Sequence, residues 1–337
     1  TMRPIYEKAV ADAKAADTPE KRRGVGIAWG GFNVTEGGGD SAEVALELMP
    51  GNKIRKYDTW HAMGQGATTG SLVVTLEALK EMHLTPEDIQ LIQNDTKTCP
   101  DTGMAGASRS LYMDGNATII AANKLLAAMR KEDGTLRTYD EMKAEGIETK
   151  YLGRYETNTT PGLCRLDPNT GIGDPTPAFT YCLNLAEVEV DTKTGKTTVL
   201  KFTCVDFVGR IGNIDAVNGQ AYSGIMHGIG FALKEDYADV KKHANMFGAG
   251  TSYIKDVPDD INLIHIDGAI SDGPFGSSGA SEAFQASGHC AVLNGIYNAC
   301  GVRIHEIPAL PEKVKAGLDA IAKGEKPYEP KKYFLGS

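Results

Sequence analysis

Apolar residues recur along the chain with two spacings, and each spacing predicts one kind of secondary structure. Alternation of apolar and polar residues is typical of half-buried strands, and it occurs in residues 42–49 and 188–207. The second segment predicts a hairpin, because Thr194 and Gly195 supply a turn between its two runs. Further strands are predicted over residues 24–33, 52–60 and 89–95, the second of them pairing with 42–49.

Apolar residues three or four positions apart predict amphipathic helices. The segments with this spacing are residues 1–23, 66–82, 107–132, 214–236 and 282–300. Gly301 is well placed to end the last of them, since glycine adopts the left-handed conformation found after helix ends. Strands and helices do not alternate regularly, so the pattern predicts an α+β fold.

One polar stretch rich in proline and glycine, residues 157–178, is the only candidate for a linker. It also fits a long surface loop. We expect a first lobe over residues 1–160, a second lobe over 161–325 and a tail over 326–337, with no tandem repeat.

Composition narrows the functional class. The chain has 337 residues and a formal net charge of −9, which argues against nucleic acid or an anionic membrane as the main partner. No apolar run approaches the roughly 20 residues that a membrane span needs. The first residues lack the apolar core of a secretory signal, and we expect a cytoplasmic protein.

Cysteine and histidine spacing bears on metal binding. The six cysteines form no C-x-x-C pair and the seven histidines form no H-x-x-x-H pair. A zinc or iron–sulfur site built by this chain alone is therefore disfavoured. We expect no metal ligated directly by protein side chains, and any metal would be brought by another group.

Three glycine-rich loops each precede a predicted helix. They span residues 63–70, 101–110 and 273–282, and "NGQAYSG" (218–224) is a fourth small-residue segment. Such loops let backbone N–H groups approach an anion, and side chains such as Gln65, Ser108 and Arg109 would add donors. Each loop alone is better explained by tight turns and close packing. None matches a nucleotide-binding fingerprint, and together they suggest one large polyanionic ligand.

Six collinear motifs give the chain a specific resemblance. They are "RRGVGIAWG", "MGQGATTG", "TCPDTGMAGASRS", "NGQAYSGIMHGIGFAL", "DGPFGSSGASE" and "IYNACGVRIHEIPALPEKV", over about residues 20–316. In this order they resemble the second half of the molybdenum-binding subunit of the xanthine oxidase family, most of all its aldehyde oxidoreductase branch. The resemblance implies an α+β molybdenum-binding domain of that type.

The resemblance assigns roles to matching positions. The cofactor-binding candidates are Met63, Gly64, Gln65, Gly66, Ala105, Gly106, Ala107, Ser108, Gln220 and Ser281. Glu282 matches the catalytic glutamate beside molybdenum, although local sequence alone favours a helix-capping acid at this position. The chain has "GASE" where the family commonly has "GVGE", so Ser281 replaces a glycine. Phe32 and Glu36 fall in the substrate funnel, where Glu36 would make the pocket more polar or is a solvated loop acid.

The implied cofactor is molybdenum–molybdopterin cytosine dinucleotide with a terminal sulfido or selenido ligand. Glu282 would take the proton from an oxygen ligand of the metal, which then hydroxylates an electron-poor carbon. An N-heterocycle such as nicotinate or a purine is the expected substrate, and an aldehyde is the alternative.

The family's remaining parts are absent from this sequence. The resemblance implies an N-terminal-half molybdopterin subunit, an iron–sulfur subunit with [2Fe–2S] clusters and often an FAD subunit. The chain is then either a fragment or one subunit of a split enzyme, and we expect a natural subunit of such a hetero-oligomer, similar to the medium molybdopterin chain of nicotinate dehydrogenase. A non-catalytic scaffold or assembly subunit is the alternative from another class.

Overall fold

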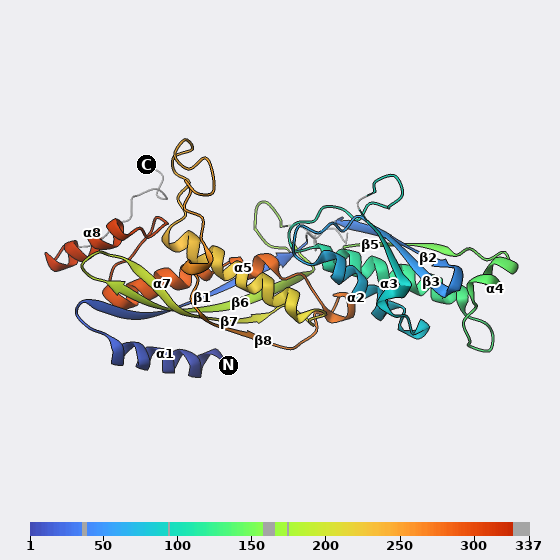
Figure 1. The fold of residues 1–337 in the computed structure, drawn as a ribbon, viewed down its shortest axis with the longest axis horizontal. Helices are drawn as coiled ribbons and strands as arrows, with labels where there is room; N and C mark the ends of the chain where they lie inside the picture. The colour runs from blue at the N-terminus through green and yellow to red at the C-terminus, as the bar shows by residue number, and fades with distance from the viewer. Residues whose placement is uncertain (36–38, 94, 158–165, 174, 326–337) are drawn as a thin grey trace.

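The computed structural model describes residues 1–35, 39–93, 95–157, 166–173 and 175–325. Within these ranges two four-stranded sheets follow one another along the long axis of the molecule (Figure 1). Their strand orders are β1-β6-β7-β8 and β4-β3-β2-β5. Helices pack on these sheets, which confirms the α+β class. No helix in the described part is both long enough and apolar enough to cross a bilayer.

The first sheet consists of β1 (Lys21–Val34), β6 (Ala178–Asp191), β7 (Thr197–Phe207) and β8 (Asp260–His265). The pairs β1–β6 and β6–β7 are antiparallel, whereas β8 runs parallel to β7. The helices around it are α1 (Met2–Ala16), α5 (Ile214–Leu233), α6 (Ser281–Gln285), α7 (Gly288–Cys300) and α8 (Pro311–Ala322). Helix α1 covers one face, and α5 and α7 cover the other (Figure 1).

The second sheet consists of β2 (Ser41–Met49), β3 (Lys53–Asp58), β4 (Ile89–Gln93) and β5 (Lys150–Glu156). The helices that belong to this half are α2 (Ala67–Ala78), α3 (Ser110–Met129) and α4 (Tyr139–Ala144). Leu46, Leu48 and Ile54 pack with α3 residues such as Leu125 in a fully buried core. Short 3-10 turns complete the fold: η1 (Pro50–Asn52), η2 (Lys80–Met82), η3 (Pro86–Asp88), η4 (Ile254–Asp256) and η5 (Pro274–Gly276).

Glycines in β1 let α7 lie directly on the first sheet. A Cβ added at Gly26 would lie 2.0 Å from the carbonyl oxygen of Ala291, and one at Gly24 would lie 2.2 Å from that of Gly295. No side chain fits at either position, so the strand "RRGVGIAWG" is shaped by the helix above it.

Most predicted elements are confirmed, and the differences lie at their ends. The hairpin strand β6 starts ten residues earlier than expected, at Ala178. The helix expected from residue 107 starts at Ser110, because Ala107 and Ser108 have positive φ. The helix expected over residues 282–300 is divided into α6 and α7. Gly301 ends α7 with φ of 77°, as predicted.

The predicted boundary between two lobes at residue 160 stays a prediction. The two sheets, however, are not separated at that point in the sequence. Strand β1 comes from the predicted first lobe and pairs along its length with β6 from the second. Residues 158–165, which contain the expected boundary, lie outside the described ranges, as does the tail from 326.

Candidate functional site

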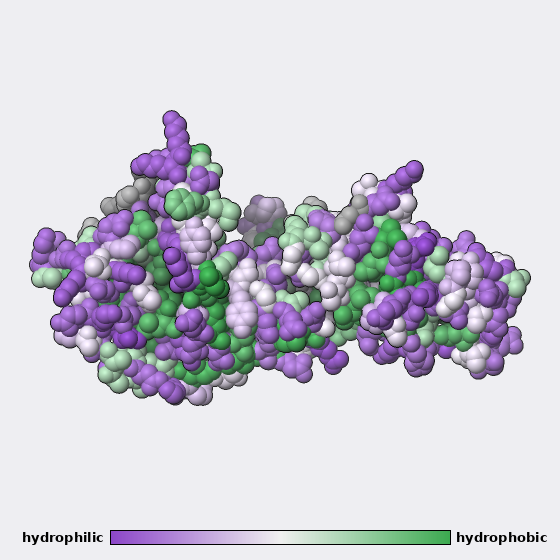
Figure 2. Space-filling model, in the orientation of Figure 1, coloured by the Kyte–Doolittle hydropathy of each residue, from purple (hydrophilic) through white to green (hydrophobic). Residues whose placement is uncertain are grey.

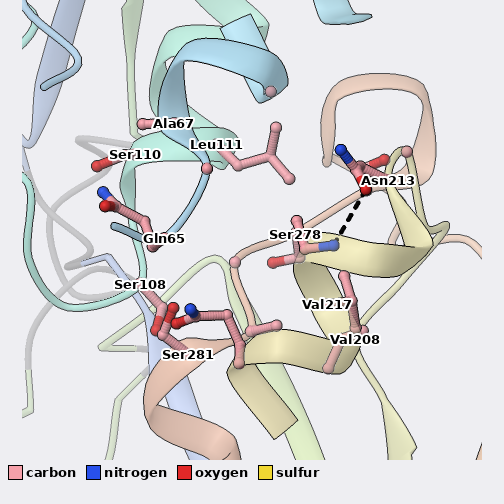
Figure 3. Close-up of a pocket in the computed structure, with 18 of the residues that line it drawn as sticks. Gln65, Ala67, Ser108, Ser110, Leu111, Val208, Asn213, Val217, Ser278 and Ser281 are labelled. Carbon is pink, nitrogen blue, oxygen red and sulfur yellow. Dashed lines mark hydrogen bonds between the residues drawn. The ribbon is translucent and has the colours of Figure 1, made fainter. Parts of the chain in front are cut away.

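Four segments far apart in sequence line one cavity of ≈ 1160 Å³. It lies where the two sheets meet, between the start of α2, the start of α5 and the loop that leads into α6 (Figure 3). The predicted site residues on its wall are Met63, Gly64, Gln65, Gly66, Ala105, Gly106, Ser108, Gln220, Ser281 and Glu282. The sequence motifs therefore converge in space.

The loop before α2 owes its shape to two left-handed glycines. Gly64 has φ of 109° and Gly66 has φ of 85°, and α2 begins directly afterwards. Gln65 holds the turn by accepting from the N–H of Met63 at 2.5 Å and by donating to the carbonyl of His61 at 3.2 Å. Met63 is 69% exposed. All four residues of this turn line the cavity at the start of α2, where a helix N-terminus favours an anion.

The loop before α3 contains two strained residues. Ala107 and Ser108 adopt φ of 51° and 48° without being glycine, a conformation that costs about 1–2 kcal/mol per residue. The carbonyl of Ala107 accepts a hydrogen bond from the N–H of Thr35 at 3.1 Å, and Ala107 does not line the cavity. This hydrogen bond directs the Ala107 carbonyl toward the end of β1, and the cofactor contact of Ala107 stays a prediction.

Glu282 lies at the start of α6 and is bound to the α3 loop rather than to its own helix. The Ser108 hydroxyl donates to the Glu282 carboxylate and accepts from the Glu282 N–H at 3.2 Å. Helix α6 has no side-chain cap at Ala280. A Cβ at Gly279 would lie 1.7 Å from the carbonyl oxygen of Ser108, so only glycine lets the two loops approach this closely.

Helix α5 brings Gln220 to the cavity. Asn213 caps it, accepting from the N–H of Ala216 at 3.0 Å, as the dashed line in Figure 3 shows. On the other side of the helix Asn218 Oδ1 lies 2.8 Å from His265 Nε2, which ties α5 to β8. The "NGQ" segment is thus fixed at both its cap and its flank.

Two buried polar groups on the cavity wall have no partner in the described part of the chain. They are the indole N–H of Trp60 and the hydroxyl of Ser278, whose residues are 6% and 5% exposed. Unsatisfied buried donors are costly, so they mark positions where a ligand would supply acceptors. Sequence reasoning missed both, because nothing in the local pattern distinguishes an orphaned donor from a satisfied one.

The charged side chains on the cavity wall are Glu77, Arg210, Asp215 and Glu282. Three of these four groups are acidic, so binding of an anion here depends on backbone N–H groups, neutral donors and Arg210. Glu77 is paired with Lys80 at 2.9 Å. Within the described ranges no three His, Cys, Asp or Glu side chains form a group that could hold a metal ion.

Two further predicted positions lie away from the cavity, and a third is not described. Arg109, expected to donate to a ligand, is 2% exposed and bonded within the protein. Phe32 does not line the cavity, because strand alternation directs it to the core beneath α5 and α7. Glu36 lies outside the described residues.

A buried charge cluster supports the wall from behind. Lys56 Nζ lies 2.8 Å from Asp114 Oδ1 and 3.3 Å from Asp58 Oδ2, and all three side chains are fully buried. Asp58 also accepts from Ser71 of α2 at 2.7 Å and from Gln93 of β4 at 2.7 Å. Burial disfavours the charged form and raises the pKa of Asp114 to about 6. The cluster joins β3, α2 and α3 behind the cavity.

Comparison with known proteins agrees with the cavity and its motifs. Residues 3–258 match the family described as "Molybdopterin cofactor-binding domain". The aldehyde oxidoreductase of Megalodesulfovibrio gigas is 40% identical over 319 residues, which are 95% of this chain and 35% of that protein. The solved aldehyde oxidoreductase of Desulfovibrio desulfuricans superposes with a TM-score of 0.89 at 43% identity, covering 93% of this chain and 34% of that one.

A more distant relative is named as a subunit of a complex. The 6-hydroxypseudooxynicotine dehydrogenase complex subunit gamma of Paenarthrobacter nicotinovorans is 23% identical, over 95% of this chain and 43% of that protein. The chain thus spans 35% to 43% of the length of these two curated relatives.

Proposed function

The chain belongs to the family of molybdopterin cofactor-binding domains found in molybdenum enzymes of the xanthine oxidase family, and from that premise we propose that it forms part of the active site of a molybdenum hydroxylase. The observation that supports this most is the convergence of four motifs on one cavity with Glu282 at its edge. The reaction adds an oxygen from water to an electron-poor carbon and releases two electrons and two protons.

We propose molybdenum–molybdopterin cytosine dinucleotide as the cofactor, with a terminal sulfido or selenido ligand. When bound, the molybdenum centre supplies the two-electron redox chemistry. The orphaned donors Trp60 and Ser278 and the left-handed glycines before α2 fit a ligand rich in acceptors. The residues that would hold it are Met63, Gly64, Gln65, Gly66, Ala105, Gly106, Ser108, Gln220 and Ser281.

Glu282 serves as the general base in this proposal. Its carboxylate accepts a proton from the water-derived oxygen that attacks the substrate carbon. The hydrogen bond from Ser108 selects one orientation of that carboxylate. Because the same hydroxyl also holds the Glu282 N–H, the side chain and the backbone of the base are fixed by one neighbour.

An aldehyde is the substrate class that the comparisons favour, since the relatives at 40% and 43% identity are named aldehyde oxidoreductases. An N-heterocycle such as nicotinate or a purine is the second candidate. Ser281 supports it, because this hydroxyl lies on the cavity wall where the family commonly has glycine, and it could bind a ring nitrogen.

Partner polypeptides complete the enzyme in this proposal: an N-terminal-half molybdopterin subunit, a [2Fe–2S] subunit that takes the electrons, and an FAD subunit. The surface in Figure 2 is mainly hydrophilic at both ends, with hydrophobic residues gathered over the middle of each lobe. Trp29 is 65% exposed, and Phe247 and Ile254, in the segment between α5 and β8, are 84% and 87% exposed. Apolar side chains exposed to this degree fit contact with other chains.

Metal analysis of the assembled enzyme tests the proposal. A tagged chain is purified with the proteins that co-elute, and molybdenum per chain is measured together with turnover of aldehydes and N-heterocycles in H₂¹⁸O. Glu282→Gln should retain molybdenum and lose about 10²–10⁴-fold in kcat, the usual contribution of a general base. Glu132→Gln, which changes an exposed loop acid, is the matched control.

Two results would contradict this function. Wild-type complexes without molybdenum would show that the cavity holds something else. Molybdenum-loaded Glu282→Gln with unchanged kcat would favour the alternative, a scaffold or assembly subunit that kept the fold without the chemistry.

A further inference from the structure

Arg109 uses every donor it has inside the protein. Its guanidinium pairs with both oxygens of Asp40, through Nε at 2.6 Å and Nη2 at 2.8 Å. The remaining donors bond to the carbonyls of Ser41 at 2.9 Å, Thr102 at 3.0 Å and Met104 at 2.7 Å. Since a guanidinium has five N–H groups, no donor remains for a ligand. The function of Arg109 must therefore be exerted through its neighbours.

Those neighbours include the strained turn of the α3 loop. Arg109 follows directly after the left-handed pair Ala107 and Ser108. On the opposite side Asp40 accepts from the Thr35 hydroxyl, and the Thr35 N–H donates to the carbonyl of Ala107 at 3.1 Å. The ion pair and the turn thus form one closed set of hydrogen bonds.

The loop is also shaped around the guanidinium. A Cβ at Gly103 would lie 2.7 Å from Arg109 Nη1, so glycine leaves room for the arginine at this point. Arg109 is 2% exposed, and the Asp40 side chain is 21% exposed. A buried bidentate ion pair tolerates little change in the positions of its two side chains, because leaving either charge unpaired in the interior would cost free energy.

We propose that the Arg109–Asp40 ion pair is a positioning clamp for the base. It holds Ala107 and Ser108 in their left-handed conformation and thereby directs the Ser108 hydroxyl to Glu282. Arg109 is a positioning residue that acts through Ser108, and it does not touch the cofactor or the substrate. This inference rests on the proposed function only where it takes Glu282 as the base.

Lysine at position 109 separates charge from geometry. An ammonium group would still neutralise Asp40, but it cannot form a bidentate pair and reach three further carbonyls at the same time. Arg109→Lys should therefore keep the loop folded and loosen the turn. Asp40→Asn is the reciprocal variant, which keeps the side-chain size and removes the charge.

A double-mutant cycle in the assembled enzyme tests the clamp. The variants are Arg109→Lys, Ser108→Ala and the double variant, with Arg154→Lys as control, since Arg154 pairs with two acids on an exposed strand face. Each single variant should lower kcat roughly 10–100-fold with KM unchanged, as expected when a catalytic group is displaced by about 1 Å. The double variant should be no slower than the slower single variant, because both act by one route. Molybdenum content should stay at the wild-type level.

Amide exchange gives a second readout, independent of turnover. Backbone amides of residues 102–110 should exchange at least about tenfold faster in Arg109→Lys than in the control. If Arg109→Lys does not fold, Asp40→Asn should give the same local increase.

The clamp would be overturned if the losses of kcat in the two single variants multiplied in the double variant. It would also be overturned if molybdenum-loaded Arg109→Lys showed unchanged amide exchange at residues 102–110. Failure of the proposed function is distinguishable from these outcomes. It would appear in the wild type as absent molybdenum, or as full turnover by Glu282→Gln, whereas the exchange comparison still decides whether Arg109 holds the turn.

Discussion

The contact between the loop before α3 and the loop before α6 leads to a specific prediction about stability. Gly279 lies against Ser108, and a Cβ built on it would be 1.7 Å from the Ser108 carbonyl oxygen and 2.6 Å from its carbonyl carbon. Gly279 has no positive φ, so alanine is not disfavoured by backbone conformation. Gly279→Ala therefore tests steric contact alone.

The size of the effect follows from that distance. A real Cβ essentially never lies closer than 3.0 Å to such an atom, so the separation must grow from 1.7 Å by at least 1.3 Å. Forcing packed groups apart costs about 1–3 kcal/mol. The shift also breaks the hydrogen bond from Ser108 to Glu282, and a bond to a charged group contributes roughly 1.5–3 kcal/mol. The lower entropy of the unfolded alanine chain offsets about 0.4–1 kcal/mol.

We therefore expect Gly279→Ala to lose roughly 2–5 kcal/mol of unfolding free energy. Urea denaturation of the assembled protein at fixed concentration measures the loss. Gly212→Ala is the control, because Gly212 has no positive φ and its Cβ would meet only Val73 Cγ1 at 3.6 Å, an ordinary contact. A Gly279→Ala protein as stable as this control would refute the reasoning, since the two loops could then not be in the contact described.

Two further predictions concern the sheets and their support. Because the pKa of Asp114 is raised from 3.8 to about 6, the folded state holds this proton more tightly. The wild-type free energy of unfolding relative to Asp114→Asn should therefore fall by roughly 2 kcal/mol as pH rises from about 4 to about 6. Urea denaturation of both proteins at a series of pH values measures it, and a stability difference that does not change with pH would contradict it. Gly26→Ala would place a Cβ 2.0 Å from the Ala291 carbonyl oxygen; we expect a loss of about 1–3 kcal/mol, visible as a lower Tm, and an unchanged Tm would argue against this contact of β1 with α7.

The spacing of apolar residues located most helices and strands, because burial of one face of an element determines which of its own residues are apolar. It could not locate the start of α3. Nothing in "AGASRS" signals left-handed backbone at Ala107 and Ser108, since that conformation depends on Thr35 and Asp40, about seventy residues away. The apolar spacing continues through Ala107, so the sequence predicted a helix where long-range hydrogen bonds prevent one.

The division between α6 and α7 was hidden for a similar reason. The break falls at Ser287, which has φ of −139° and ψ of 3°. Its hydroxyl accepts from Asn184 on β6 at 3.0 Å, and Gly30 on β1 leaves space for it, since a Cβ there would lie 2.9 Å from the same oxygen. The apolar pattern of residues 282–300 continues across this point, so only the packed sheet shows why the helix is interrupted.

At the site, the motifs correctly predicted which loops meet but not what each polar group does. Arg109 has the sequence context of an anion ligand, yet burial commits all its donors to the protein. The reverse holds for Trp60, which lies outside every motif, and for the Ser278 hydroxyl, which its motif did not single out; among the described residues both are unpaired donors on the wall. Whether a donor is free depends on distant partners, and sequence spacing carries no information about those.

The glycine-rich loops share a composition but serve different physical needs. Gly64 and Gly66 supply positive φ for a turn, whereas Gly279 supplies a missing side chain so that a carbonyl can pass. The conformation that Arg109 maintains is held by charge and hydrogen bonds rather than by glycine. The direction of the Glu282 carboxylate thus depends on two features. One is the close contact of Gly279 with Ser108, which leaves no room for a Cβ, and the other is the ion pair of Arg109. Variants at positions 279 and 109 should consequently disturb the same acid by separable routes, one through sterics and the other through hydrogen-bond geometry.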